Sequence, residues 1–363
     1  MRSKKILFLA AQISIHARRW ANAMDEQGYE IHFVTQHSSS HGMNDSVTVH
    51  YLPYQGIKGY FINYFSLRRL INDIKPDLLH ASYATGYGTL ARLVGFRPYL
   101  LSVWGSDVFL FPKKSIFHRW FLKGNLQAAD HLCSTSKAMR FEVESICSDL
   151  KKVDITPFGV DVNKFLSKGL SQKDKALFTI GTIKTLSHIY GIDTLIIGFS
   201  KLVETMRLEN IKQAESLRLL IVGGGPQRAY LESLAENLGV SELVEFTGEI
   251  EHSNIAEYYN KLDVFVAVSR SESFGVSVLE ASASALPVIV SDVGGLPEVV
   301  VHGKTGFIIP ADAPEDLAST LAKMIQDMPA LKRMGEEGRN FVNTRFSWGH
   351  SVEIMKEVYG KLI

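Results

Sequence analysis

The sequence predicts an α/β protein made of two doubly wound domains, each built around a parallel sheet. Three observations lead to this prediction. The chain has 363 residues, which is more than one hydrophobic core usually organises. Short apolar segments alternate with longer helical patterns along both halves, as in βαβ units. A stretch rich in turn formers and charge, residues 157–175, interrupts this alternation.

In the first half, the apolar segments are expected to be strands and the periodic segments between them helices. We expect strands at 5–10, 31–36, 77–82 and 99–105, and helices at 16–28, 64–74 and 86–95. The segment 157–175 is expected to be a linker, because it has no hydrophobic period. The first domain is therefore predicted over residues 1–165.

The same alternation restarts in the second half. We expect strands at 177–182, 217–225, 244–249, 263–269 and 287–293, and helices at 190–205, 226–238, 253–260, from 276 and at 314–326. The second domain is therefore predicted over residues 166–344. Residues 345–363 show apolar residues at helical spacing, and we expect them to form a helix that crosses back to the first domain.

Composition indicates an intracellular globular protein. Hydrophobic residues make up 46% of the chain, and its only cysteines, Cys133 and Cys147, lack the spacing of a zinc or redox pair. The apolar segment at 5–11 is too short to span a bilayer. We therefore expect a cytoplasmic protein without a signal peptide or a membrane anchor.

Charge is distributed unevenly, although the net charge is only +1. Residues 1–165 contain 20 Lys and Arg against 13 Asp and Glu, whereas residues 166–363 contain 19 against 25. This asymmetry fits a cleft with polarised walls, a basic face for anionic lipid or phosphate, or simply scattered surface lysines. Nucleic acid is not an expected partner, because the whole chain is nearly neutral and carries no recognition motif.

Two glutamates eight positions apart follow the predicted strand at 263–269. Glu272 lies in the loop after the strand, and Glu280 lies in a helix that begins near Val276. The first turn of such a helix has unpaired N–H groups and roughly +0.5 of charge, so it can bind an anion. A nucleotide sugar offers hydroxyls to the carboxylates and a diphosphate to the helix. By spacing alone, a solvated loop residue and a helix-cap residue fit equally well.

The segment Glu272–Glu280, ESFGVSVLE, resembles the E-x7-E motif of the retaining glycosyltransferases of family 4, which have the GT-B fold. Residues 281–298 and 302–307 resemble the block that follows it in that family, and Val222–Pro226 and Phe246–Gly248 stand in the usual places between strand and helix. The resemblance covers the C-terminal domain and, more loosely, the N-terminal one. It implies two Rossmann-like domains that face each other across a cleft, which closes around the substrates.

The resemblance also implies how the second domain binds a nucleotide-diphosphate sugar. Glu280 is expected to bind the donor ribose, and Glu272 is expected to contact the hydroxyls of the donor sugar. The backbone amides of Phe274, Gly275 and Val276 are expected to lie near the sugar and the phosphates. The family mechanism implies retention of anomeric configuration, with the leaving diphosphate helping to deprotonate the acceptor.

One departure from the family concerns the positive charges that neutralise the diphosphate. The family usually has an Arg after the glycine of the domain's first strand and a Lys before the next glycine, and here Thr182 and Tyr190 stand in those places. Lys184 is the best candidate to supply the charge, with His188 second. Because the sequence contains no D-x-D pair, and Lys184 with a helix N-terminus could stabilise the leaving group, we expect neither a divalent metal nor another cofactor to be required.

The glycine-rich turn at Gly223 and Gly224 is expected to border the donor site. It is neither a dinucleotide fingerprint nor a P-loop, because the third fingerprint glycine is missing and no G-K-[ST] follows. We interpret it as a strand-to-helix turn with Pro226 at the first helical position. Its first role is expected to be packing, and a contact with the ligand is the second.

Loops after three strands of the first domain are expected to form the acceptor side. They carry Ser14 and His16, then His80, and then Trp104 and Asp107. A lone histidine such as His16 is more often a structural residue than a functional one. Many relatives have a histidine where this chain has Trp104, so the role of that histidine cannot be carried over to this chain. Asp107 could orient the acceptor hydroxyl or cap the next helix.

The segment 108–123 interleaves aromatic residues with lysine and arginine, as interfacial membrane segments do. It could therefore bind an anionic membrane surface and make the protein peripheral on the inner face of the plasma membrane. The alternative is a helix whose Phe and Trp side chains face the core, and this alternative is slightly favoured.

The sequence therefore predicts a retaining glycosyltransferase that moves a sugar from a nucleotide-diphosphate donor to a glycan or lipid-linked acceptor, in surface polysaccharide biosynthesis. The catalytic residues are expected to be Glu272 and Lys184. Two other interpretations stay open. One is a catalytically silent nucleotide-sugar-binding scaffold, and the other is a sugar-phosphate synthase or phosphorylase on the same fold.

Overall fold

The computed structural model describes residues 3–39, 42–150, 152–166 and 177–363, and the chain divides into two units. Unit 1 comprises residues 1–158 and 349–363, and unit 2 comprises residues 159–348. The second part of the predicted linker, residues 167–175, lies outside the described residues.

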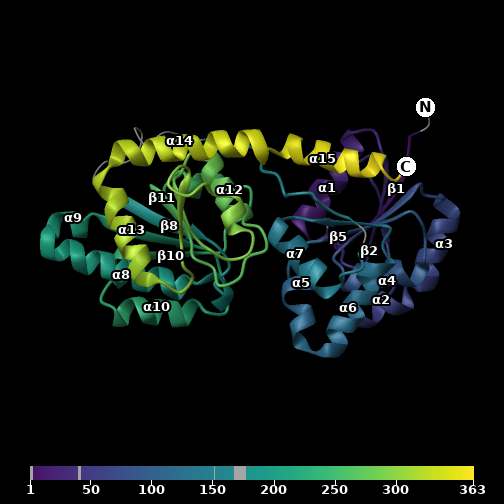
Figure 1. The fold of residues 1–363 in the computed structure, drawn as a ribbon, viewed down its shortest axis with the longest axis horizontal. Helices are drawn as coiled ribbons and strands as arrows, with labels where there is room; N and C mark the ends of the chain where they lie inside the picture. Colours follow the sequence, from purple (N-terminus) through teal and green to yellow (C-terminus); the bar gives the residue numbers. More distant parts are fainter. Residues whose placement is uncertain (1–2, 40–41, 151, 167–176) are drawn as a thin grey trace. The chain divides into compact units, whose positions relative to one another are not determined.

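Unit 1 contains a parallel sheet with the strand order β3-β2-β1-β4-β5-β6-β7. Figure 1 labels β1, β2 and β5 of this sheet. Its strands are β1 (Lys5–Leu9), β2 (Glu30–Thr35), β3 (Thr48–Tyr51), β4 (Leu78–Ser82), β5 (Tyr99–Val103), β6 (His131–Ser134) and β7 (Val153–Ile155). Every residue of β4 and β5 is buried, as expected for central strands of a sheet that is covered on both faces.

The helices of unit 1 connect these strands. They are α1 (Ile15–Glu26), α2 (Gly56–Ile62), α3 (Tyr64–Ile74), α4 (Gly86–Val94), α5 (Ser106–Phe109), the 3-10 turn η1 (Phe111–Lys114), α6 (Ile116–Ala128), α7 (Lys137–Ile146) and α15 (Trp348–Gly360). The capping residues explain several helix starts: Ser14, Ser115 and Ser136 each accept a hydrogen bond from an amide of the first turn.

Unit 2 contains a second parallel sheet, with the order β10-β9-β8-β11-β12-β13. Its strands are β8 (Phe178–Ile183), β9 (Leu217–Val222), β10 (Val244–Gly248), β11 (Val264–Ala267), β12 (Val288–Ser291) and β13 (Gly306–Ile309). Its helices are α8 (Ile192–Glu209), α9 (Ile211–Glu215), α10 (Arg228–Asn237), α11 (Ile255–Tyr259), α12 (Val276–Ala283), α13 (Pro314–Gln326) and α14 (Met328–Arg345), with the 3-10 turns η3 (His188–Tyr190), η4 (Ser241–Leu243) and η5 (Leu296–Glu298). Both units are therefore Rossmann-like.

The boundary between the units falls seven residues before the predicted one. The amide of Val160 donates to the carbonyl oxygen of Phe346 (2.9 Å), and the amide of Trp348 donates to that of Val160 (2.9 Å). Phe165 is buried, and its ring lies 5.6 Å from that of Tyr259. These contacts attach residues 159–166 to unit 2.

The last helix belongs to unit 1. Tyr359 of α15 is fully buried, and its hydroxyl hydrogen-bonds to a histidine of β4 at 2.7 Å. Lys361 pairs with Asp154 of β7. Unit 1 is thus assembled from two segments of the chain. Among the described residues, no helix is long and apolar enough to cross a bilayer.

Candidate active site

The loops after β8 and β11 bring the two predicted catalytic residues together. The two strands pair directly in the sheet, so their carboxyl ends lie side by side. Lys184 follows β8, Glu272 follows β11, and the Lys184 ammonium donates a hydrogen bond to Oε2 of Glu272. Each side chain is only 11% exposed, so the ion pair lies in a largely desolvated position.

Tyr190 contacts this ion pair. The Lys184 ammonium lies 4.8 Å from the centroid of the Tyr190 ring, within the range of a cation–π interaction. Tyr190 stands where the family usually has a lysine. In this chain that place holds an aromatic ring that contacts the Lys184 ammonium.

Two glycines bring the backbone of this site into close contact. Gly223 has φ +135°, and a Cβ there would overlap the carbonyl oxygen of Lys184, whose amide donates to Val222 at 3.0 Å. Gly294 has φ +54°, and a Cβ there would overlap the carbonyl oxygen of Glu272. Glycine is required at both places because of positive φ and lack of space. Gly223 thus has a packing role.

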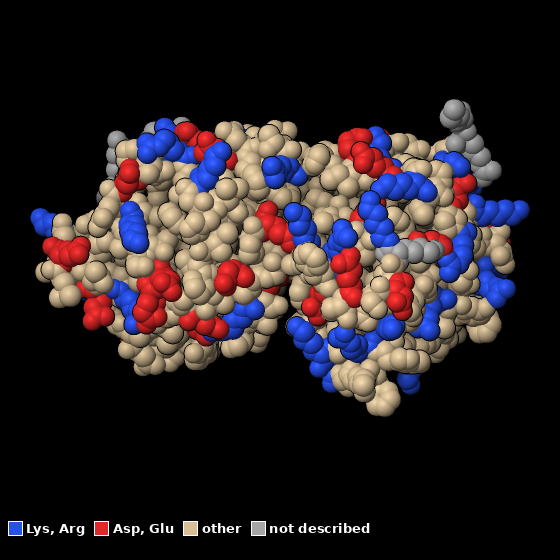
Figure 2. Space-filling view, viewed as in Figure 1, with Lys and Arg blue, Asp and Glu red and all other residues tan. Residues whose placement is uncertain are grey.

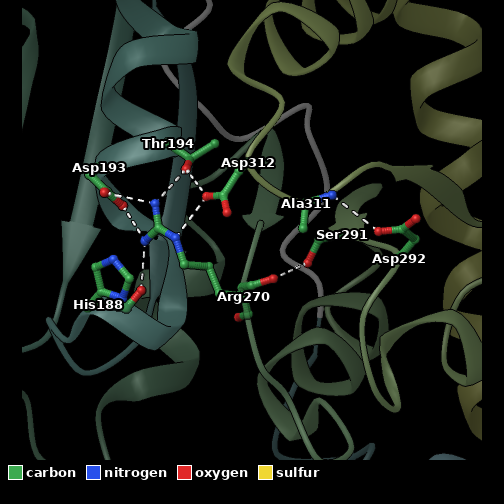
Figure 3. A network of polar contacts seen from close by, with 9 residues as sticks. His188, Asp193, Thr194, Arg270, Ser291, Asp292, Ala311 and Asp312 are labelled. Carbon is green, nitrogen blue, oxygen red and sulfur yellow. Dashed lines mark hydrogen bonds and ion pairs between the residues drawn. The ribbon is translucent and has the colours of Figure 1, made fainter.

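Arg270 fixes the loop that carries Glu272, and no sequence motif indicated it. Its guanidinium binds both carboxylate oxygens of Asp193, at 2.8 and 2.9 Å, and its Nε lies 2.8 Å from Asp312 (Figure 3). It also donates to the carbonyl oxygen of His188 at 2.7 Å. His188, predicted as the second phosphate ligand, therefore contributes its backbone to this network.

The charges in this network stabilise one another. Burial by itself would raise the pKa of Asp193, but hydrogen bonds and the positive charge of Arg270 lower it below its usual value. The hydrogen bond that Arg270 donates to Asp193 correspondingly raises the pKa of Arg270. The backbone adds a further link, because the amide of Arg270 donates to the carbonyl oxygen of Ile189 at 2.8 Å. The network thus ties the loop before α8 to the loop that carries Glu272.

Glu280 is held separately from Glu272. It is buried in α12, and the hydroxyl of Tyr259 donates to its Oε2 at 2.9 Å. His252 Nε2 lies 3.7 Å from Oε1, and the Lys164 ammonium lies 2.9 Å from Nδ1 of the same imidazole. Burial, with the nearby Glu280 carboxylate, raises the pKa of Tyr259 well above its usual value, so its hydroxyl stays a donor. Each carboxylate oxygen can accept more than one hydrogen bond, so Glu280 can still bind a ligand hydroxyl.

The first turn of α12 lies between the two glutamates in the chain. Gly275 caps the helix with φ +104°, and the helix begins at Val276. Phe274 is buried and packs against Phe346, with ring centroids 5.9 Å apart. Its side chain therefore anchors the loop, and its amide and those of Gly275 and Val276 lie at the positive end of the helix.

Unit 1 contains a pocket of about 470 Å³ beyond the carboxyl ends of β1, β4 and β5. It is lined by Ala11, Ile13, Ser14, Tyr60, Ser82, Tyr83, Thr85, Gly86, Tyr87 and Trp104. Four of these residues are aromatic. Ser82 is buried, and among the described residues its hydroxyl has no hydrogen-bond partner. The pocket therefore offers mainly aromatic rings to a ligand.

Two predicted acceptor-side residues line this pocket and two support it. Ser14 and Trp104 line it. The ring of His16 stacks on that of Phe158 at 4.1 Å and lies 6.5 Å from that of Trp104. Asp107 is buried and accepts hydrogen bonds from the amides of Ala84 (2.8 Å) and Gly105 (2.8 Å). Burial raises its pKa despite these amides. Asp107 thus positions two loops of the pocket, as a cap would.

His80 does not lie on the acceptor side. It is buried in β4, where Nδ1 hydrogen-bonds to Tyr359 at 2.7 Å and Nε2 hydrogen-bonds to Ser102 at 2.8 Å. Burial lowers its pKa to about 3. Both ring nitrogens are engaged within the core, so the expected acceptor contact is replaced by a structural role.

Two family models match the chain. The model of glycosyl transferases group 1 matches residues 164–341, and the glycosyl transferase 4-like model matches residues 5–136. An uncharacterized glycosyltransferase of Methanocaldococcus jannaschii is 26% identical over 358 residues, which cover 96% of this chain and 94% of the relative. A GDP-mannose-dependent alpha-(1-6)-phosphatidylinositol monomannoside mannosyltransferase of Mycobacterium tuberculosis is 28% identical over 302 residues, which cover 78% and 75%.

Solved structures share the fold across the whole chain. Sucrose-phosphate synthase of Thermosynechococcus elongatus has a TM-score of 0.83 at 19% identity, with 99% of each chain covered. Anabaena HepE in complex with UDP-glucose has a TM-score of 0.79 at 18% identity and covers 99% of this chain and 100% of its own.

Proposed function

Because the chain belongs to the family 4-like glycosyltransferases, with the GT-B fold, we propose that it moves a sugar from a nucleotide-diphosphate donor to a glycan or lipid-linked acceptor. We further propose that the transfer retains the anomeric configuration. The observation that carries the proposal is the largely buried pair of Lys184 and Glu272 beside the two strand ends of unit 2. This pair combines a cation for phosphate with a carboxylate for sugar hydroxyls.

In the proposed mechanism, unit 2 binds the donor. Glu280 accepts hydrogen bonds from the ribose hydroxyls, and Glu272 accepts them from the transferred sugar. Lys184 and the amides at the start of α12 supply the positive charge that stabilises the leaving diphosphate. These groups are why we propose that a divalent metal is not required. The complex of Anabaena HepE with UDP-glucose supports a nucleotide sugar as donor.

We propose that the acceptor binds the pocket of unit 1. Its aromatic rings suit the apolar face of a sugar ring. The acceptor hydroxyl that attacks the donor sugar loses its proton to the leaving diphosphate, as the family resemblance implies. No protein carboxylate acts as the nucleophile, because Glu272 is committed to Lys184 and to the sugar hydroxyls.

We also propose a role in surface polysaccharide assembly, with the protein on the cytoplasmic side of the plasma membrane. The Mycobacterium tuberculosis relative, named for a phosphatidylinositol monomannoside, supports an acceptor of the lipid-linked class.

The donor proposal is tested by thermal unfolding with a panel of nucleotide sugars. A ligand at a hundredfold excess over its Kd stabilises the folded state by about 2.7 kcal/mol, so the matching donor should raise the Tm by several degrees. Turnover is then measured with free-sugar, sugar-phosphate and lipid-linked acceptors, and the product anomer is assigned by NMR. Stabilisation without turnover on any acceptor would indicate a silent scaffold, and consumption with a sugar phosphate alone would indicate a sugar-phosphate synthase. If no nucleotide sugar raises the Tm, the donor proposal fails.

A further inference from the structure

The start of α6 exposes large apolar side chains to solvent. Ile116 is 78% exposed, Phe117 is 77% exposed and Trp120 is 70% exposed. Residues 116 and 120 are one turn apart and share a face of the helix. Isolated exposed apolar residues are common, but three within five positions form a patch that calls for an explanation.

These side chains do not face the core, contrary to the interpretation favoured from the sequence. The buried face of α6 consists of Leu122, Asn125 and Leu126. Asn125 is held there because its side-chain amide donates to the carbonyl oxygen of Ala84 (2.9 Å) and to Thr89 (2.8 Å). The rotation of the helix is therefore fixed, and Phe117 cannot turn inward without breaking these contacts.

Basic side chains surround the exposed apolar residues. Lys113 and Lys114 of η1 and Arg119 of α6 are exposed, and the sequence from 108 to 129 contains no Asp or Glu. Figure 2 shows blue side chains gathered beside an uncharged protrusion at the end of unit 1 where Figure 1 places α5 and α6. The Arg119 guanidinium donates to the carbonyl oxygen of Ser145 at 2.6 Å, which fixes its position beside the patch.

We infer that this surface, formed by Lys113, Lys114, Ile116, Phe117, Arg119 and Trp120 and named the tip surface, docks on an anionic lipid bilayer. Aromatic and aliphatic side chains can enter the boundary between headgroups and acyl chains, while lysine and arginine bind the anionic headgroups. Charge complementarity selects this occupant. The apolar part is a single helical turn, which is small for the core of a stable protein interface.

Vesicle co-sedimentation tests the inference without donor or acceptor, so its failure would leave the proposed transfer reaction untouched. The full chain should sediment with vesicles of phosphatidylglycerol and phosphatidylcholine, and much less with phosphatidylcholine alone. Each basic residue near an anionic surface contributes about a fivefold factor to binding, so the double variant Lys113→Gln, Lys114→Gln should bind about 25-fold more weakly. Trp120→Ser should reduce binding by about tenfold, since it removes an inserting ring. Raising the salt to about 1 M should release the protein, because the Debye length falls to about 3 Å.

Matched variants in unit 2 control for charge and for exposed apolar area. The double variant Lys332→Gln, Arg333→Gln removes two exposed cations of α14, and Leu208→Ser removes a side chain that is 86% exposed. Neither should change vesicle binding. Equal binding to neutral vesicles, or unchanged binding of the Lys113→Gln, Lys114→Gln variant, would overturn the inference. So would a dimer in sedimentation velocity that Trp120→Ser dissociates while lipid binding is absent, since the surface would then join two copies of the chain.

Discussion

The replacement Lys184→Ala is the most direct test of the proposed site. It removes the ammonium that contacts both Glu272 and the Tyr190 ring. We expect a folded protein that has lost most of its turnover. The reason is that the proposed transition state places negative charge on the diphosphate, and the two places where the family usually has cations hold Thr182 and Tyr190.

The expected magnitudes follow from the burial of the pair. Both side chains are 11% exposed, and removal of one partner from a buried ion pair destabilises a protein by about 3–5 kcal/mol. Folded domains are stable by about 5–15 kcal/mol, so the Tm should fall while the fold survives. The loss of a preorganised group that stabilises developing charge lowers kcat by about 10²–10³-fold.

The assay separates these two effects with a double variant. Donor consumption is measured for Lys184→Ala, Glu272→Gln, the double variant and Lys184→Arg, each at a temperature below its own Tm. The double variant removes the unpaired carboxylate, so it should recover much of the lost stability without recovering kcat. Lys184→Arg keeps the charge and should retain more activity than Lys184→Ala.

Two results would refute this reasoning. Near-normal kcat in Lys184→Ala would show that another group neutralises the diphosphate. Recovery of kcat in the double variant would show that Lys184 acts only by pairing with Glu272, and that it has no role toward the leaving group.

Three further predictions concern the supporting structure. Arg270→Ala should lower the Tm at neutral pH, as measured by calorimetry. Because the pKa of Asp193 is held below its usual 3.8, the Tm difference between wild type and variant should shrink as the pH falls below that value. A Tm difference that stays constant with pH would contradict this prediction. His80 has a pKa of about 3 against an ordinary 6.5, so between these pH values only the unfolded chain binds a proton at this residue. The Tm of the wild type should therefore fall more than that of His80→Gln as the pH drops from 6.5 to 3. Equal falls of the two Tm values would contradict this prediction. Gly294→Ala should raise the donor KM by about tenfold or more, since a strain of about 1–3 kcal/mol is added and the new Cβ collides with the backbone of Glu272. Gly303, which has φ +74°, has open space around a new Cβ, so Gly303→Ala should leave the KM unchanged.

Strand-end chemistry was predictable from the sequence because parallel strands place their following loops at one edge of the sheet. Lys184 and Glu272 were each assigned to such a loop, and the structure joins them. The Arg270 network was not predictable, because its partner Asp193 lies 77 positions away and a single charged loop residue gives no pairing signal. The acceptor-side role predicted for His80 was wrong because His80 lies within β4, and the loop that lines the pocket begins after this strand. The His80 side chain is buried in the core.

Helices without a clear apolar stripe were not predicted from periodicity. The helix α14 carries many charged residues, and its start depends on Asp327, which accepts from the amide of Ala330 at 2.9 Å. Helix α6 contains two pairs of apolar residues at helical spacing. One pair is 116 and 120, and the other is 122 and 126. Periodicity identifies two candidate faces there, and only the tertiary contacts of Asn125 determine which one is buried.

The return of α15 to unit 1 has a consequence for biosynthesis. Residues 1–158 emerge from the ribosome long before Tyr359 is translated. In the folded unit the Tyr359 hydroxyl forms a hydrogen bond with the buried His80. Unit 2 is continuous in the chain and emerges in between, so it can complete its fold first. The nascent first unit therefore keeps part of its surface uncovered until residues 349–363 have been translated.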